Sequence, residues 1–181
     1  MRSVDKTSSR LENFKLSRGR FSFSRCDLLI SGKARVEEWI KLHELKWRVL
    51  DMPSSTKTVD DAARALGVSK SVIVKTLVVI CENAVLAVIV PGDRRLDMSK
   101  LENLAKNCRF AKPKEVEILT GYPAGGVPPV ALPESIKVIM DRVLLDKDVV
   151  YGGGGDLNSL LEFSPRDLVS LGFVVILDVS R

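Results

Sequence analysis

The spacing of apolar residues predicts a fold in which hairpins are mixed with helices. The β-branched run 72–80 predicts a buried strand. The turn Glu82-Asn83 then predicts that the apolar run 85–90 pairs antiparallel with it. Further short runs with strand character lie at 48–52, 109–111, 136–140, 149–151, 160–163 and 173–179.

Helical spacing and capping residues predict helices between these strands. Apolar residues at helical spacing predict a helix over about 34–46. Thr58, with Asp61 three residues later, predicts a capped helix that ends at Gly67. Further helices are expected after Asp97 or Ser99, from Pro113 to Leu119, and from Ser164 to Gly172. Because no strict βα unit repeats, this order favours an α+β fold with a mainly antiparallel, curved sheet.

The composition is that of one globular domain with a tail. Of 181 residues, 45% are hydrophobic and 28% are charged, which is ordinary for such a domain. No apolar run approaches the roughly 20 residues that span a bilayer. The N-terminus also lacks the apolar centre of a signal peptide. We therefore expect a cytoplasmic protein with no membrane partner.

The positive charge is concentrated at the N-terminus. Residues 1–35 hold nine Lys or Arg against three Asp or Glu, a net +6, which leaves −1 of the total +5 for the rest. We expect a basic extension over 1–33 and a globular domain over 34–181. The extension is either an arm that binds RNA or another polyanion or a solvated, poorly ordered tail.

The cysteine and histidine content excludes several kinds of site. Cys26, Cys81 and Cys108 are too few and too scattered to predict a disulfide framework or a zinc site. The single histidine, His43, falls within a helical apolar pattern and is expected to pack there. A Ser-His-Asp or Cys-His nucleophile is therefore not expected, and neither is a metal or a cofactor.

Two features stand out from this background. Lys75 lies inside the apolar run 72–80. Burying its charge unpaired would cost on the order of several kcal/mol, so it must reach the strand edge or meet an anionic partner. The segment 120–129, TGYPAGGVPP, has glycines that allow close backbone approach and prolines that stiffen its exit. Such a loop can cradle a ligand with its backbone amides.

VKTLVV at 74–79, followed by TGYPAGGVPP at 120–129, resembles the YbaK/ProX family of aminoacyl-tRNA editing domains. That family includes free-standing proteins and inserted domains of prolyl-tRNA synthetases. The resemblance runs from about Val36 to the C-terminus. It includes STKT at 55–58, DDAARALGV at 60–68, VIVPGDRRLD at 88–97, the Asp141 segment and SPRDL at 164–168. It implies a mixed, barrel-like sheet flanked by helices.

The resemblance implies a catalytic role for Lys75 and for the glycine loop. The Lys75 ammonium could hold a nucleotide phosphate or polarise the scissile carbonyl. A role as a general base is ranked below this electrostatic role. The structural alternative is a lysine whose ammonium reaches solvent at the strand edge. Amides of Gly125, Gly126 and Val127 could bind the carbonyl or position water, unless the loop is only a turn. Relatives often have Gly-His where this chain has Ala131-Leu132, so no histidine acts there.

The resemblance also implies a set of substrate-binding residues. Hydroxyls at 55–58 could bind the amino acid's ammonium or the ribose, although helix capping is favoured for Thr58. Asp141 could pair with Lys75 or meet the substrate amine, or it is a turn residue. The glycines 152–155 predict a flexible turn near the pocket. The full set is Ser55, Thr56, Thr58, Tyr122, Pro129, Asp141, Gly153 and Gly154.

The function that the resemblance implies is hydrolysis of mischarged aminoacyl-tRNA in trans. Water would attack the ester at the acceptor end without a metal, and a small pocket would act as a size sieve. The expected substrate is tRNA(Pro) carrying a small wrong amino acid, and prolyl-tRNA synthetase is the expected partner. The alternative is a module of the same fold that binds tRNA, a nucleotide or a synthetase without chemistry.

Overall fold

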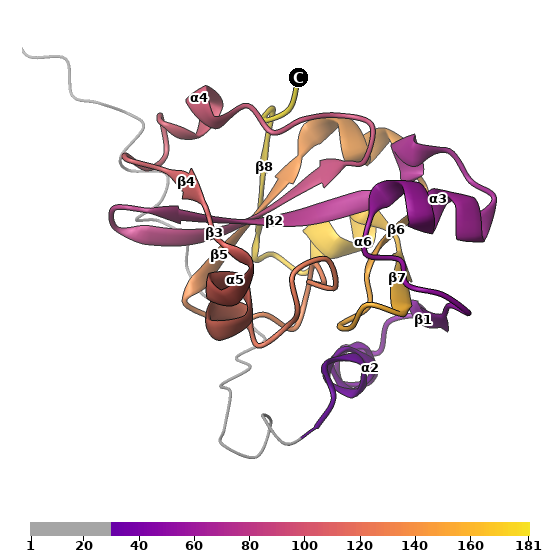
Figure 1. The fold of residues 1–181 in the computed structure, drawn as a ribbon. Coiled ribbons are helices and arrows are strands. Elements are labelled where there is room, and N and C mark those ends of the chain that lie inside the picture. The colour runs from indigo at the N-terminus through magenta and orange to yellow at the C-terminus, as the bar shows by residue number, and fades with distance from the viewer. Residues whose placement is uncertain (1–29) are drawn as a thin grey trace, which may run out of the picture.

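The computed structural model describes residues 30–181, so residues 1–29 of the expected extension lie outside it. The described part contains five helices and eight strands (Figure 1). The helices are α2 Gly32–Leu42, α3 Val59–Leu66, α4 Met98–Leu101, α5 Pro113–Thr120 and α6 Pro165–Ser170. The strands are β1 Arg48–Asp51, β2 Val74–Cys81, β3 Ala84–Pro91, β4 Arg109–Phe110, β5 Ile136–Asp141, β6 Val150–Gly153, β7 Ser159–Phe163 and β8 Val174–Leu177. Within this range, no helix has the length and apolar character that crossing a membrane requires.

The strands form two sheets. The larger has the order β4-β2-β3-β5-β8, and the smaller has the order β1-β7-β6. The β2–β3 hairpin, the β2–β4 pair and the whole smaller sheet are antiparallel, whereas β3–β5 and β5–β8 are parallel. A single bridge between Ile73 and Tyr151 joins the two sheets. The α+β class with a mixed, mainly antiparallel sheet is therefore confirmed, as two joined sheets rather than one closed barrel.

Both faces of the larger sheet are covered. On one face, Val74 and Val78 of β2 pack in a core with Val36 of α2 and Val116 of α5. On the other, Val79 and its neighbours pack against residues of α4. Figure 1 shows α4 on one side of the β2–β3 hairpin and α2 and α5 on the other. Alternate side chains of β2 thus pack into two different cores, as expected for a strand inside a sheet that is covered on both faces.

Local capping chemistry sets the helix ends. Thr58 accepts a hydrogen bond from the Asp61 N–H (3.1 Å), and Gly67 ends α3 with φ +67°, as predicted. Helix α2 starts two residues earlier than predicted, at Gly32, because Ser31 caps it. His43 lies just past its end, with its ring stacked on Trp39 at 3.8 Å and Nδ1 2.8 Å from the Trp39 carbonyl oxygen. The histidine is packed, as expected.

The glycines 152–155 do not form the predicted turn. Gly152 and Gly153 are the last residues of β6. A Cβ on Gly153 would lie 2.5 Å from the Val127 carbonyl oxygen, so only glycine lets β6 pack against the glycine loop. Gly155, at φ +104°, donates its N–H to the Gly126 carbonyl oxygen at 3.0 Å. The run is therefore a backbone-to-backbone packing surface.

A disulfide joins Cys81 to Cys108. The scattered cysteines predicted no disulfide framework, and this bond was not predicted. Cys81 ends β2, and Cys108 directly precedes β4. The β2–β4 register, which pairs Ile80 with Arg109, brings the two together. Their separation of 27 residues in sequence gave no sign of this, because it is the return of the chain after α4 that makes them neighbours.

Candidate functional site

A cavity of about 240 Å³ opens where the start of β2, the segment before α3, the glycine loop and β6 meet. Its polar side chains are all hydroxyls or ammonium groups, and the rest of its wall is apolar or glycine. The polar residues are Thr56, Lys57, Thr58, Lys75 and Thr76. The others are Val59, Ala62, Ile73, Val74, Leu77, Gly125, Val127, Gly152, Gly153 and Leu160. Among residues 30–181, no residue that lines the cavity is a carboxylate or a histidine.

One edge of β2 is open at the cavity. Strand β4 pairs with β2 only at Val79 and Ile80, with one further bond from the Ala111 N–H to the Val78 carbonyl oxygen at 2.9 Å. Backbone groups of alternate residues point to the same edge of an antiparallel strand. The N–H and C=O of Thr76 therefore point to the same edge of β2 as those of Val78. At Thr76 this edge borders the cavity instead of β4. The Thr76 hydroxyl is buried and has no hydrogen-bond partner within residues 30–181.

Lys75 is held at the cavity by a neutral hydrogen-bond partner. Its Nζ donates to the Arg94 carbonyl oxygen at 2.6 Å, and within residues 30–181 it forms no ion pair. Burial lowers the pKa of Lys75, the nearby Arg95 guanidinium lowers it further, and Asp93 opposes them. The sequence left two options for Lys75, the strand edge or an anionic partner, and the structure gives its ammonium a neutral carbonyl as hydrogen-bond partner. An anionic ligand would relieve this arrangement.

The glycine loop presents part of the expected amide cradle. Gly125, at φ +99°, and Val127 both line the cavity. Gly126 does not: its N–H donates to the Pro123 carbonyl oxygen at 2.9 Å, closing a turn within the loop. The N–H of Gly126 is therefore already used within the loop, and Gly126 stays outside the cavity lining. Gly125 and Val127 keep the expected position.

Tyr122 and Pro129 support the loop from behind and do not line the cavity. Tyr122 is fully buried, its hydroxyl donates to the Ala131 carbonyl oxygen at 2.8 Å, and the Arg35 guanidinium lies 4.2 Å above its ring. Burial raises the pKa of Tyr122 to about 12, against the opposing effect of Arg35. Pro129 is buried beside Gly152. These contacts fix the path of the loop between 122 and 131.

The segment before α3 contributes two of its three expected hydroxyls. Thr56 and Thr58 line the cavity, whereas Ser55 is exposed and does not. The Thr56 hydroxyl donates to the Leu157 carbonyl oxygen at 3.3 Å. The Thr58 hydroxyl caps α3 and donates to the Asp61 carboxylate at 2.5 Å. Capping, the favoured interpretation of Thr58, is what the structure shows, although the residue also forms part of the cavity rim.

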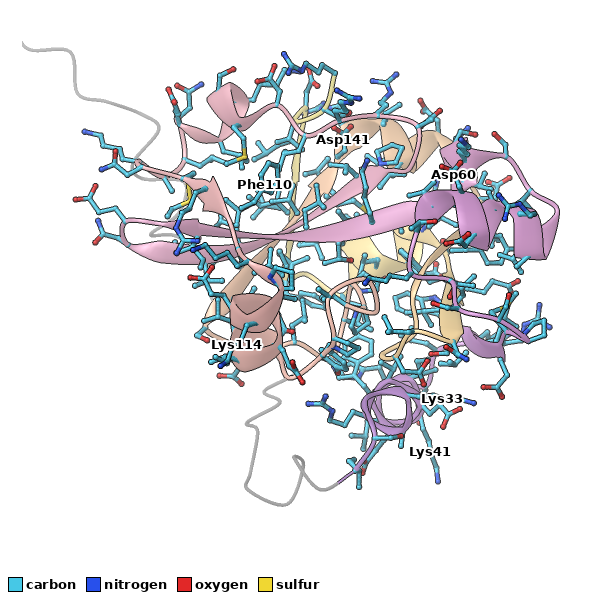
Figure 2. The ribbon with its side chains drawn as sticks, viewed as in Figure 1. Lys33, Lys41, Asp60, Phe110, Lys114 and Asp141 are labelled. Atoms are coloured by element: carbon cyan, nitrogen blue, oxygen red, sulfur yellow. A yellow bond between two sulfur atoms is a disulfide. The ribbon has the colours of Figure 1, made fainter. Side chains whose placement is uncertain are left out.

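Asp141 and Gly154 lie apart from the cavity. Asp141 ends β5 with 1% of its surface exposed, and it is labelled in Figure 2. Its carboxylate accepts three backbone N–H groups, from Val143 at 2.9 Å, Val179 at 3.1 Å and Ser180 at 2.7 Å. It does not pair with Lys75. Gly154 packs against Ser159. Gly153, in contrast, lines the cavity as expected.

Lys57 and Thr76 are cavity residues that the sequence reasoning missed. Lys57 lies within the STKT segment, in which the hydroxyls were the expected binding groups. It packs over Gly125, and it forms no ion pair within the described range. Thr76 follows Lys75 directly, and strand alternation places the two on opposite faces. Both reach the cavity because it wraps around the open edge of β2. No cluster of three or more His, Cys, Asp or Glu within 30–181 could hold a metal ion.

Comparisons with known proteins identify relatives of this chain. An uncharacterized protein of Bacillus subtilis (strain 168), YwhH, is 31% identical over 140 residues, which are 74% of this chain and 89% of that protein. The proline–tRNA ligase of Fervidobacterium nodosum is 37% identical over 113 residues, 61% of this chain. This chain covers only 20% of that ligase.

Solved structures are also similar. The crystal structure of a hypothetical protein matches with a TM-score of 0.79 and 54% identity, over 81% of this chain and 99% of that one. A candidate trans-editing enzyme for prolyl-tRNA synthetase matches with a TM-score of 0.76 and 31% identity, over 88% and 99% of the two chains. The family model of the aminoacyl-tRNA editing domain matches residues 53–171, a range that includes every residue lining the cavity. The chain therefore belongs to the aminoacyl-tRNA editing domain family.

Proposed function

We propose that this chain is a free-standing hydrolase that removes a wrong amino acid from aminoacyl-tRNA. The observation that carries the proposal is Lys75: a cation with a lowered pKa, a neutral partner and an apolar cavity beside it. An aminoacyl ester at the end of a tRNA offers what this site lacks. It brings phosphates, a carbonyl that becomes an oxyanion, and a small side chain for the apolar wall.

In the proposed reaction, water adds to the ester carbonyl and the bond to the ribose oxygen then breaks. The Lys75 ammonium and the amides of Gly125 and Val127 stabilise the negative charge that develops on the carbonyl oxygen. The proton lost by the water is transferred to the departing ribose oxygen. The products are the free amino acid and the tRNA with its terminal hydroxyl restored. Because no carboxylate or imidazole lines the cavity, the neighbouring ribose hydroxyl and solvent relay that proton.

The size of the cavity supports a small aminoacyl group as the substrate. Its volume of about 240 Å³ is below the ~300–1,000 Å³ of pockets that enclose drug-sized ligands. Such a pocket admits small errors and excludes larger cognate residues. The similarity to proline–tRNA ligases and to the candidate trans-editing enzyme supports tRNA(Pro) as the carrier and prolyl-tRNA synthetase as a partner. We place the activity in the cytoplasm, where tRNA is charged.

The proposal is tested with a panel of tRNAs charged with alanine, cysteine, serine, threonine or proline. The wild type should cleave one or two of them, and Lys75→Ala should lower that turnover by about 10²–10³-fold while it still binds tRNA. Lys137→Ala is the matched control, because Lys137 is an exposed strand lysine with no ion pair within the described residues. Cleavage at the wild-type rate in Lys75→Ala would reject the role assigned to this lysine.

A binding module without chemistry is the second candidate. The absence of a carboxylate or imidazole from the cavity lining favours it, because water then has no protein base. It predicts that no tRNA of the panel is cleaved. It also predicts salt-sensitive tRNA binding that weakens when residues 1–29 are removed and is unchanged by Lys75→Ala.

A further inference from the structure

Phe110 is an aromatic side chain left in solvent beside the site. It is 49% exposed, whereas every other aromatic residue between 30 and 181 is buried or half-buried. It sits on β4, a strand of two residues at the edge of the larger sheet. Figure 2 shows it on the side of the sheet that carries α4. Large exposed apolar residues also occur at Ile30, Leu42, Ile118 and Val149, none of which lies on this sheet.

The register of the sheet places this ring in line with the cavity. Phe110 lies directly opposite Val79, and directly opposite residues share a face of an antiparallel pair. Lys75 and Leu77 precede Val79 at even spacing, so they lie on that same face. At about 3.4 Å per residue, Leu77 at the cavity wall is about 7 Å from Val79 along the strand, and Lys75 about 14 Å.

A lysine follows the ring closely along the chain. Lys112 follows Phe110 by two residues, directly before α5, with φ −71° and ψ 157°. Continuing the strand register places Lys112 across from Leu77. Lys112 is exposed, and its ammonium has no ion pair in the described part of the chain. Arg109, in contrast, is bound to Glu115 by two hydrogen bonds of 2.8 Å.

Strand β4 is anchored at both ends. The disulfide ties Cys108 to the end of β2. On the other side, Glu115 binds Arg109 and accepts the Lys112 N–H at 2.7 Å. The ring and the ammonium are therefore carried by a backbone that is fixed before any ligand arrives. A fixed aromatic platform loses little entropy on binding.

We propose that Phe110 stacks on a base of the unpaired nucleotides that precede the esterified adenosine, and that Lys112 contacts a phosphate between that base and the cavity. An exposed aromatic ring with a neighbouring cation is the combination that binds single-stranded nucleic acid. A docking surface for a protein would need a larger apolar patch, and on this sheet Phe110 stands alone. The inference rests on the proposed function, because it takes an aminoacyl-tRNA as the ligand.

The test compares two substrates that share the same ester. One is the full aminoacyl-tRNA, and the other is the same amino acid esterified to adenosine alone. Phe110→Ala should raise KM for the tRNA by between about fivefold and 150-fold, equivalent to the ~1–3 kcal/mol of one stacked base. It should leave kcat and the cleavage of aminoacyl-adenosine unchanged. Phe110→Tyr should behave as the wild type, and so should Ile118→Ala, which removes an exposed apolar residue (73%) on α5.

Lys112→Ala should weaken tRNA binding as well and reduce its salt dependence by about one phosphate contact. An equal effect of Phe110→Ala on both substrates, or no effect on either, would overturn the inference. So would lost binding to prolyl-tRNA synthetase with tRNA affinity intact, which would make β4 a protein-docking strand.

If the wild type cleaves neither substrate, the proposed function fails, and binding then decides the inference. Uncharged tRNA with and without its 3′-terminal CCA is the probe. A loss of affinity in Phe110→Ala that is confined to the tRNA with CCA would uphold the stacking role. Equal affinity of the variant and the wild type would reject it.

Discussion

Lys75 and Asp141 are charged side chains on strands of the same sheet, separated only by β3, and their surroundings differ. Asp141 is enclosed, and three backbone N–H groups satisfy both of its oxygens. Lys75 has a single neutral acceptor, a cationic neighbour and a cavity at its side. Both were candidates for the site from the sequence. A partly buried charge points to a ligand only where its partners leave it incompletely satisfied.

Replacing Lys75 should have the largest effect on activity and a small effect on folding. We expect Lys75→Ala to lower the deacylation rate by about 10²–10³-fold, the usual cost of losing one oxyanion donor. The midpoint of thermal unfolding should change little, because the wild-type ammonium is poorly satisfied. Single-turnover deacylation and calorimetry measure the two effects. A large fall in stability would mean that Lys75 holds the fold together.

Replacing Asp141 should do the reverse. Asp141→Ala leaves the buried N–H groups of Val179 and Ser180 without an acceptor, at about 1–3 kcal/mol each. Denaturant unfolding should show that loss, while the rate per folded molecule stays near the wild-type value. Asp146→Ala, an exposed aspartate with no ion pair in the described range, is the control. A rate that falls without a loss of stability would place Asp141 in the reaction.

Thr76→Val tests the role of the Thr76 hydroxyl at the cavity wall. The hydroxyl has no partner within residues 30–181, so replacing it with a methyl of similar shape should leave stability unchanged or slightly higher. If the hydroxyl contacts the substrate, kcat/KM should fall about tenfold, the value of one ordinary hydrogen bond. Unchanged kinetics would show that only the Thr76 backbone is used.

The pH dependence of deacylation should reflect the pKa of Lys75. If the ammonium acts, activity is present below its pKa and is lost as pH rises through it, and that pKa lies below the ordinary lysine value of 10.5. Arg95→Gln removes a repelling charge, so the alkaline limb should move to higher pH. Asp93→Asn removes an attracting one and should move it lower. Rates are corrected for spontaneous ester hydrolysis, and shifts in the opposite directions would contradict the assignment.

The sequence predicted features that depend on neighbouring residues along the chain. The Thr58 cap, the Gly67 terminus and the β2–β3 hairpin depend on local chemistry, and the structure has them. The four glycines at 152–155 were misread because their need for glycine comes from a segment 25 to 30 positions earlier, where β6 packs on the loop at Gly126 and Val127.

The same division applies to the site. Residues that stand out in their local sequence were predicted, and residues whose role depends on distant segments were not. Lys75 stands out because a charge interrupts an apolar run, and Gly125 because of its loop. Nothing in the sequence indicates that Thr76 lies at the cavity. The edge of β2 is open at Thr76 because the pairing with the β4 segment ends at Ala111. The occupied N–H of Gly126 and the three donors to Asp141 also depend on how the chain folds back.

The Cys81–Cys108 bond makes the stability of this protein depend on its redox state. The two cysteines are 27 positions apart. Closing a loop of that length lowers the conformational entropy of the unfolded chain and so raises its free energy by about 3–4 kcal/mol. The reduced protein is therefore easier to unfold by that amount, and β4 loses one of its two anchors. Only comparisons made at one redox state therefore isolate the effect of a substitution.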